Sequence, residues 1–168
     1  GKPRRKPLAE AKRLLEKAGY PGGRDQATGR PLILYFDGIA TGPDDKARLA
    51  WIRKQIGKLG IQLVIRATDY NRFQEKMRKG TSQIFMWGWN ADYPDPENFL
   101  FLLYGPESPL DCKCDGANNS NYASEVYDEA FRKIRMLPPG PERDKLVAFA
   151  VEQFRKDAVW LYAYYPKD

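Results

Sequence analysis

The residues best suited to chemistry lie in one stretch, WGWNADYPDPENFLFLLY, which spans residues 87–104. Two tryptophans close an apolar run, and Asp92 comes soon after them, flanked by Asn90 and Tyr93. A carboxylate beside aromatic rings suits a cationic group on a small organic ligand, because the ring faces attract the cation and the carboxylate pairs with it. The same residues also fit a buried strand and a turn whose aspartates only cap a helix.

A second chemical interpretation makes Asp92 and Asp95 a carboxylate pair of the kind that hydrolyses glycosides. Asp95 precedes Pro96, however, and an Asp-Pro step is better suited to starting a helix. The chain has no histidine, and no P-loop or nucleophile elbow supports catalysis. We therefore expect a protein that is not an enzyme, with a carboxylate-based hydrolase as the alternative.

The absence of histidine also removes most zinc sites. Cys112 and Cys114 form a C-x-C pair, which supplies only two of the four ligands of a structural zinc. A disulfide across one residue is strained, and both the disulfide and the free thiols stay open. We expect no metal and no cofactor.

The chain is basic, with 28 Lys and Arg against 22 Asp and Glu, a net charge of +6 and a pI of about 9.3. A run at Arg4, Arg5 and Lys6 could bind nucleic acid or anionic lipid. The basic residues are spread along the chain and alternate with acids, so a solvated surface is favoured and no nucleic-acid partner is expected. No apolar run approaches the roughly 20 residues of a membrane span. The sequence starts at Gly1 without a signal-peptide segment.

The segments around Asp92 alternate between the apolar spacing of strands and that of helices, and these elements must position it. Strands are expected near residues 31–37, 61–66 and 83–89, after a helix over 8–18 and with helices between them over 49–59 and 70–79. Two consecutive βαβ units predict a parallel sheet with right-handed crossovers. Ligands bind beyond the carboxyl ends of such strands, which is where Asp92 would lie.

The C-terminal half is expected to be more helical. Asp95 would cap one helix and Ser124 another, with a long loop over 105–123 between them. A proline-rich break at residues 138–141 precedes a further helix. An aromatic run near 158–165 predicts a last strand. The fold class is α/β, with a mixed, largely parallel sheet flanked by helices.

Five segments in the right order are similar to the C-terminal lobe of the family 5 extracellular solute-binding proteins, the receptors of dipeptide, oligopeptide and nickel ABC importers. They are AEAKRLLEKAGYPGG (9–23), IRKQIGKLGIQLVI (52–65), FMWGWNADYPDPENFL (85–100), NNSNYASEVYDEAFRKI (118–134) and PERDKLVAFAVEQFRKDAVWLYAY (141–164). One departure is Val159, where the family usually has proline before tryptophan. Another is the Cys112–Cys114 loop, a segment that varies widely in the family.

The resemblance implies a lobe like those of type II periplasmic binding proteins. Residues 1–168 would be the C-terminal ligand-binding lobe of a larger, two-lobed receptor, with the N-terminal lobe of the same receptor as a partner. Such a receptor is periplasmic or extracellular, in some cases lipid-anchored, and delivers its solute to an ABC permease in the membrane.

In peptide-binding relatives an aspartate at the position of Asp92 pairs with the ligand's α-ammonium. The resemblance places Trp89, Asn90, Ala91 and Tyr93 on the same wall. It implies a peptide or another small amine-bearing solute. Relatives that bind nickel complexes, haem or sugars leave the ligand open, although metal chelates often need histidine, which this sequence lacks.

Overall fold

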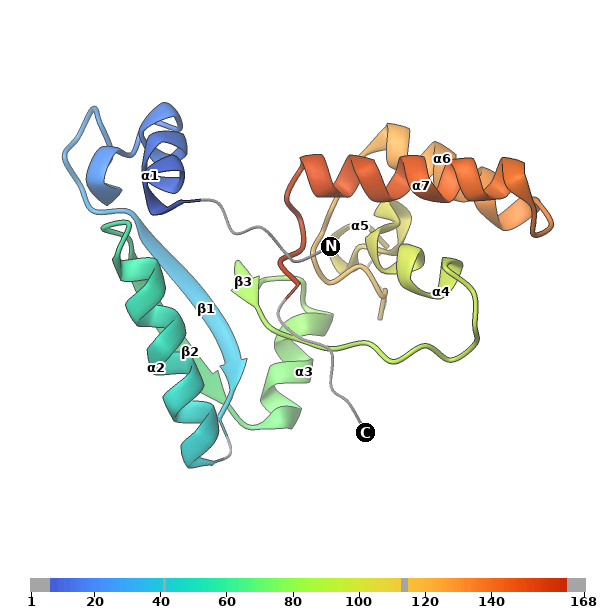
Figure 1. Cartoon of the computed structure of the whole chain (residues 1–168). Helices are drawn as coiled ribbons and strands as arrows, with labels where there is room; N and C mark the ends of the chain where they lie inside the picture. Colours follow the sequence, from blue (N-terminus) through green and yellow to red (C-terminus); the bar gives the residue numbers. More distant parts are fainter. Residues whose placement is uncertain (1–6, 41, 113–114, 163–168) are drawn as a thin grey trace. The chain divides into compact units, whose positions relative to one another are not determined.

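The computed structural model describes residues 7–40, 42–112 and 115–162. The chain forms two compact units (Figure 1). Unit 1 contains Gly1–Glu75 and Thr81–Trp87, and unit 2 contains Lys76–Gly80 and Gly88–Asp168. Each unit has its own hydrophobic core. None of the helices in the described part of the chain has the length and apolar character of a membrane span.

Unit 1 follows the expected order of elements. It contains α1 (Leu8–Lys17), the 3-10 turn η1 (Pro21–Gly23), β1 (Ile33–Ile39), α2 (Pro43–Gly57), β2 (Gln62–Thr68), most of α3 (Tyr70–Arg78) and β3 (Ile84–Phe85). Helix α2 starts earlier than its apolar stripe predicts, because Pro43 occupies the first helical position and two aspartates favour the first turn. Asp69 caps α3 as expected, accepting the Arg72 N–H at 3.0 Å.

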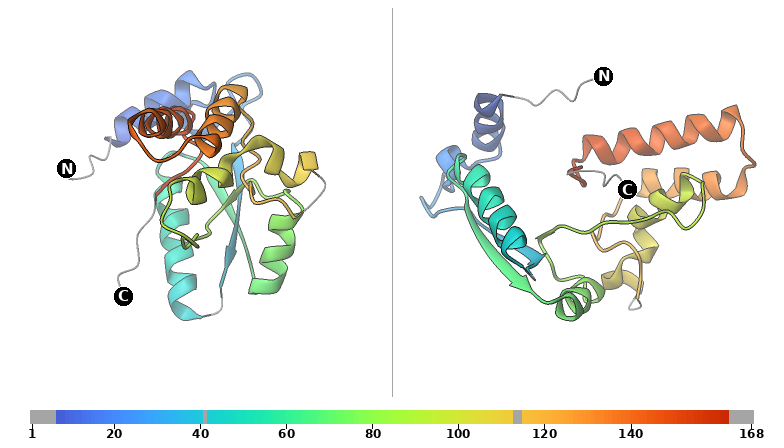
Figure 2. Two further views of the ribbon diagram at one scale, coloured as in Figure 1. Left: turned by 90° about the vertical axis from the view of Figure 1, so that its right-hand side faces the viewer. Right: turned by 60° about the horizontal axis from the view of Figure 1, so that its bottom comes forward.

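The sheet has the order β2-β1-β3, and both pairs of strands are parallel. This arrangement confirms the predicted fold class. Phe36 of β1 lies opposite Ile65 of β2 and Ile84 of β3. Helix α2 packs its apolar side on this sheet, and Figure 2 shows it running alongside β1 and β2. Phe36, Leu49 and Leu63 are the buried residues of this core.

Two glycine turns fix the starts of β1 and β2 relative to each other. Gly23 and Gly60 have φ of +75° and +81°, which side chains rarely adopt. A Cβ on Gly23 would lie 2.3 Å from the Gly60 carbonyl carbon, and one on Gly60 would lie 2.0 Å from the Gly22 oxygen. Leu32 bridges the turns, because its N–H donates to the Gly23 carbonyl and its carbonyl accepts from Gln62.

Two expected strands differ from the structure. The strand expected over 83–89 is only Ile84–Phe85. Beyond it, the Trp87 ring packs edge-on against Phe73 at 5.5 Å between centroids, so this aromatic residue contributes to packing rather than to the sheet. The last strand, expected over 158–165, is also wrong as far as the structure describes it, because residues 159–162 are irregular and residues 163–165 lie outside the described residues.

The cause of the second difference is local. Ala158 has φ of +52°, which turns the chain after α7. Val159 and Trp160 then pack against the core of unit 2, with the Trp160 ring 5.5 Å from that of Phe154. The aromatic run therefore starts by covering a helical core instead of pairing with a sheet.

Unit 2 is built from helices. They are α4 (Glu97–Leu100), the 3-10 turns η2 (Phe101–Leu103) and η3 (Gly105–Glu107), α5 (Pro109–Cys112), α6 (Glu125–Met136) and α7 (Pro141–Lys156). Ser124 caps α6 as predicted, accepting the Tyr127 N–H at 3.3 Å. The buried Tyr127 hydroxyl donates to the Leu100 carbonyl at 2.7 Å and ties α6 to α4. Cys114 lies outside the described residues, so the state of the Cys112–Cys114 pair stays open.

Candidate functional site

The five predicted site residues lie in the irregular segment of unit 2 that precedes α4. All five are exposed, and the rings of Trp89 and Tyr93 are 42% and 46% accessible. Because β3 ends at Phe85, residues 86–91 separate Asp92 from the strand. The expected position directly beyond the strand is therefore wrong. Other contacts must hold Asp92.

The main contact is Asn98, which the sequence did not indicate as part of the site. It is the second residue of the short helix α4 and is only 2% exposed. Its amide oxygen accepts the Trp89 indole N–H at 3.0 Å and the Asp92 backbone N–H at 3.0 Å. Its amide nitrogen donates to the Asp92 carboxylate at 3.4 Å. The Trp89 ring also packs edge-on against Phe101, with centroids 5.4 Å apart. Trp89 and Asp92 are thus brought together through one buried side chain.

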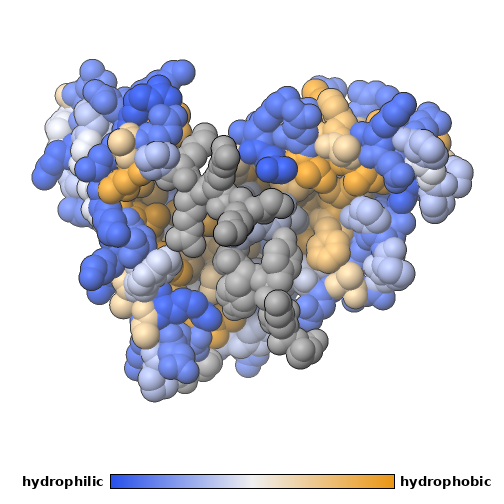
Figure 3. Space-filling model, viewed as in Figure 1, coloured by the Kyte–Doolittle hydropathy of each residue, from blue (hydrophilic) through white to orange (hydrophobic). Residues whose placement is uncertain are grey.

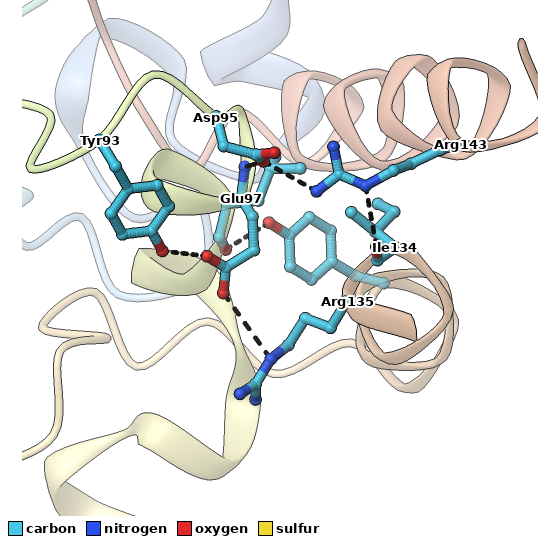
Figure 4. A network of polar contacts seen from close by, with 8 residues as sticks. Tyr93, Asp95, Glu97, Ile134, Arg135 and Arg143 are labelled. Carbon is cyan, nitrogen blue, oxygen red and sulfur yellow. Dashed lines mark hydrogen bonds and ion pairs between the residues drawn. The ribbon is translucent and has the colours of Figure 1, made fainter. Parts of the chain in front are cut away.

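The sequence predicted Asp95 as the N-cap of α4, but Pro96 occupies that position. Asp95 still binds a backbone N–H of the first turn from one residue earlier, and it forms an ion pair that the sequence did not predict. Its carboxylate accepts the Glu97 N–H at 2.8 Å and pairs with Arg143 of α7, also at 2.8 Å. The Arg143 Nε donates to the Ile134 carbonyl at the end of α6, as Figure 4 shows. The hydrogen bond from Arg143 is the main reason why the pKa of Asp95 lies below its usual value. Asp95 is therefore a charged anchor between α4 and the two long helices.

Glu97 forms a second anchor. It accepts a hydrogen bond from the Tyr93 hydroxyl and lies 3.7 Å from the Arg135 Nε (Figure 4). The hydrogen bond to Glu97 raises the pKa of Tyr93, and a hydrogen bond with Asn98 acts in the opposite direction. Tyr93 is thereby held by its hydroxyl while its ring stays accessible.

The carboxylates of Asp92, Asp95 and Glu97 differ in whether a basic side chain pairs with them. Asp95 pairs with Arg143, and Glu97 pairs with Arg135. Asp92 forms no ion pair with any residue that the structure describes, and its carboxylate accepts from a neutral amide. Asp92 is therefore the one of the three that can offer its charge to a ligand, next to two accessible rings.

The hydrolase alternative finds little support in this geometry. A general acid must hold a proton near neutral pH. Asp95 has a lowered pKa and is already bound to Arg143 and to a backbone N–H. Within the described ranges, no three side chains of the metal-binding types gather at one point. The arrangement suits binding of a cation better than acid–base chemistry.

Comparison with known proteins places the chain in a family. The model of the family described as bacterial extracellular solute-binding proteins, family 5 Middle, matches residues 1–109. Di/tripeptide-binding protein 4 of Pseudomonas aeruginosa is 28% identical over 157 residues, which cover 94% of this chain and 28% of that protein. The periplasmic oligopeptide-binding protein OppA of Salmonella typhimurium is 27% identical over 158 residues, covering 93% and 26%.

A solved structure agrees. The ABC transporter-associated periplasmic binding protein DppA from Helicobacter pylori, in complex with the peptide STSA, has a TM-score of 0.76 and 27% identity over 91% of this chain and 28% of that one. The chain thus spans little more than a quarter of the length of these relatives. Since the family model matches well over half of its residues, the chain belongs to the bacterial extracellular solute-binding proteins of family 5.

Proposed function

We propose that this chain is the C-terminal lobe of the substrate-binding component of an ABC importer. The receptor captures a small solute, most simply a peptide with a free amino terminus, and delivers it to a membrane permease. The observation that carries the proposal is the accessible Asp92 carboxylate, which lies beside exposed rings and forms no ion pair with a described residue. The names of the relatives, which bind di- and tripeptides or oligopeptides, support a peptide as the ligand.

The chemistry of capture follows from the residue types. The α-ammonium of the peptide pairs with the Asp92 carboxylate, and the rings of Trp89 and Tyr93 add their electron-rich faces. Asn90 and Ala91 line the same wall, where they are exposed. A dry, enclosed site strengthens such a pair, because screening by water is reduced.

The opposite wall is supplied by the N-terminal lobe of the same receptor, with the ligand enclosed in the cleft between the lobes. We expect the receptor to act in the periplasm or outside the cell, either free or lipid-anchored. The permease is its partner in the membrane. This proposal agrees with the chain covering little more than a quarter of its relatives.

Replacing Asp92 with asparagine in the whole receptor tests the proposal. Asparagine keeps the shape and removes the charge, so tripeptides with a free amino terminus should bind more weakly by roughly 2–5 kcal/mol, or about thirtyfold to several thousandfold. Equilibrium dialysis of a tripeptide pool and of its N-acetylated counterpart, read by mass spectrometry, gives both affinities. The acetylated pool should bind poorly to the wild type and lose little more in the variant.

The matched control is Asp144→Asn, which removes the same charge from an exposed position on α7. It should leave both affinities unchanged. Equal binding of the free-amine pool by the wild type and Asp92→Asn would reduce Asp92 to a turn residue and remove the main support for a peptide ligand.

A further inference from the structure

We propose that Asn98 is a positioning residue for recognition of the ligand's ammonium group, an inference that rests on the proposed function. Asn98 is buried, and it holds two residues that would contact the ligand through hydrogen bonds. Those bonds fix the Trp89 ring, the Asp92 backbone and the Asp92 carboxylate. One buried amide therefore sets the relative position of the ring and the charge.

The position of Asn98 is itself well fixed. The residue is 2% exposed, and its backbone N–H donates to the Asp95 carbonyl at 3.1 Å. Asp95 is in turn held by Arg143. The described hydrogen bonds occupy both acceptor positions of the Asn98 oxygen, so a rotation of the amide would break at least two of them. The segment is thus organised before the ligand arrives, which lowers the entropy cost of binding.

Asn98 carries no charge, and this matters for the ammonium site as much as its hydrogen bonds do. Arg143 orients Asp95 and also neutralises it, because it is a cation. The Asn98 amide orients Asp92 and leaves its negative charge available for the ligand. A basic residue at position 98 would occupy the carboxylate, and an acidic one would repel it.

The first test is Asn98→Leu in the whole receptor, which removes the side-chain hydrogen bonds to Trp89 and Asp92 and keeps a side chain of similar size. We expect the NMR signal of the Trp89 indole N–H, assigned with Trp89→Phe, to move and to exchange faster with water. Affinity for the free-amine tripeptide pool should fall by at least roughly tenfold. The ratio of free-amine to N-acetylated affinity should fall with it.

Ser124→Ala is the control for stability. It removes the cap of α6, which costs thermal stability without touching Trp89, Asp92 or Asn98. Its indole signal and its affinity ratio should equal those of the wild type. An Asn98→Leu receptor that loses both affinities by the same factor would show a merely structural role and overturn the inference.

Asn98→Asp provides an independent test if the leucine variant does not fold. It keeps the acceptor for Trp89 and places a second carboxyl oxygen close to the Asp92 carboxylate. Two such carboxyls repel each other when both are charged and share a proton, so the variant's affinity for the free-amine pool should rise with pH as this proton is lost, more steeply than that of the wild type. A flat profile in the variant would overturn the inference.

Asp92→Asn separates this inference from the proposed function. If Asp92→Asn lowers the affinity for the free-amine tripeptides and a folded Asn98→Leu receptor keeps the wild-type affinity, the positioning role is wrong and the proposed function stands. If the wild type binds no tripeptide in the dialysis, or if Asp92→Asn binds the free-amine tripeptides as tightly as the wild type, the proposed function fails. The inference then fails with it.

Discussion

At the scale of single residues, the partners of each carboxylate decide its role. Asp95 and Glu97 have cationic partners and hold the segment against α6 and α7. Asp92 has a neutral partner and keeps its charge. Similar side chains, close together in the sequence, thereby become two anchors and one candidate binding group.

The anchor at Asp95 gives a prediction on acid stability. Its pKa is lowered in the folded state, so the unfolded chain binds the proton more readily, and the pair stabilises the protein above about pH 4. Asp95→Asn should cost about 1 kcal/mol at neutral pH, a modest value because the carboxylate is 30% exposed. Denaturant unfolding of the wild type and of Asp95→Asn from neutral to acidic pH measures the difference in their free energies of unfolding. This difference should shrink as the pH falls through the lowered pKa of Asp95. A difference that does not change with pH would contradict this role.

Part of this site could be predicted from the sequence. Asp92 stands out beside tryptophans, and Asp-Pro is a local signal for the start of a helix. The Arg143 partner of Asp95 is 48 residues away, and no spacing rule connects the two. Asn98 resembles any polar residue of a short helix, because its burial depends on how the whole unit packs.

At the scale of elements, the glycine turns set the register of the sheet. Gly23 and Gly60 bring the backbones after α1 and α2 into contact, where no side chain fits. Leu32 then links the entries into β1 and β2. The sheet thus starts from a fixed pair of turns, from which seven residue pairs follow in parallel register.

Gly60→Ala should therefore destabilise the protein by about 2–4 kcal/mol, because alanine adds strain at positive φ and overlaps the Gly22 oxygen. Gly57→Ala is the matched comparison near the end of α2, where a Cβ meets nothing within 4 Å. It should stabilise by about 0.5 kcal/mol, since alanine is the better helix former. Urea unfolding of both variants measures the contrast, and equal stabilities would mean that the turns do not determine the register.

The longer helices and the first two strands could be predicted well because their signals are local, whereas η3 and α5 lie within residues 105–123, which were expected to form a loop. Apolar spacing, caps at Asp69 and Ser124 and glycine stops all act within a few residues. The conformation was harder to predict for Ile84–Phe85 and for residues 159–162, because an aromatic run is equally compatible with a strand and with a helical core. Trp87 and Trp160 pack on other aromatic rings, and this depends on tertiary contacts that the local sequence does not reveal.

At the scale of the whole molecule, the excess positive charge is dispersed. Several basic side chains pair with acids one helical turn away on their own helix, as in Arg13–Glu10, Arg48–Asp45, Lys133–Glu129 and Lys156–Glu152. Figure 3 shows hydrophilic residues over much of the coloured surface, with hydrophobic patches among them. This pattern is typical of a solvated surface.

The protein should therefore not bind random duplex DNA more tightly than roughly 10⁻⁴ M at physiological salt, the weak limit of non-specific binding. Fluorescence anisotropy with a labelled duplex at several salt concentrations measures this. Micromolar binding that falls steeply with salt would show instead that the basic side chains act together, as in the nucleic-acid alternative.

The sequence also predicted one domain-sized lobe over residues 1–168, and that assignment stays a prediction. The structure describes two compact units with separate cores, between which the chain passes more than once. Composition and length cannot distinguish one core from two, because both bury the same kinds of side chain.

The hydrogen bond between Trp89 and Asn98 has an optical consequence. The emission of an indole ring depends on the water and the polar groups around it. Trp89 has its N–H fixed by the protein and much of its ring open to solvent. A ligand that covers the open part changes the surroundings of the ring, while the hydrogen bond keeps its orientation. A receptor that captures its solute beside Asp92 therefore carries its own fluorescent reporter of occupancy.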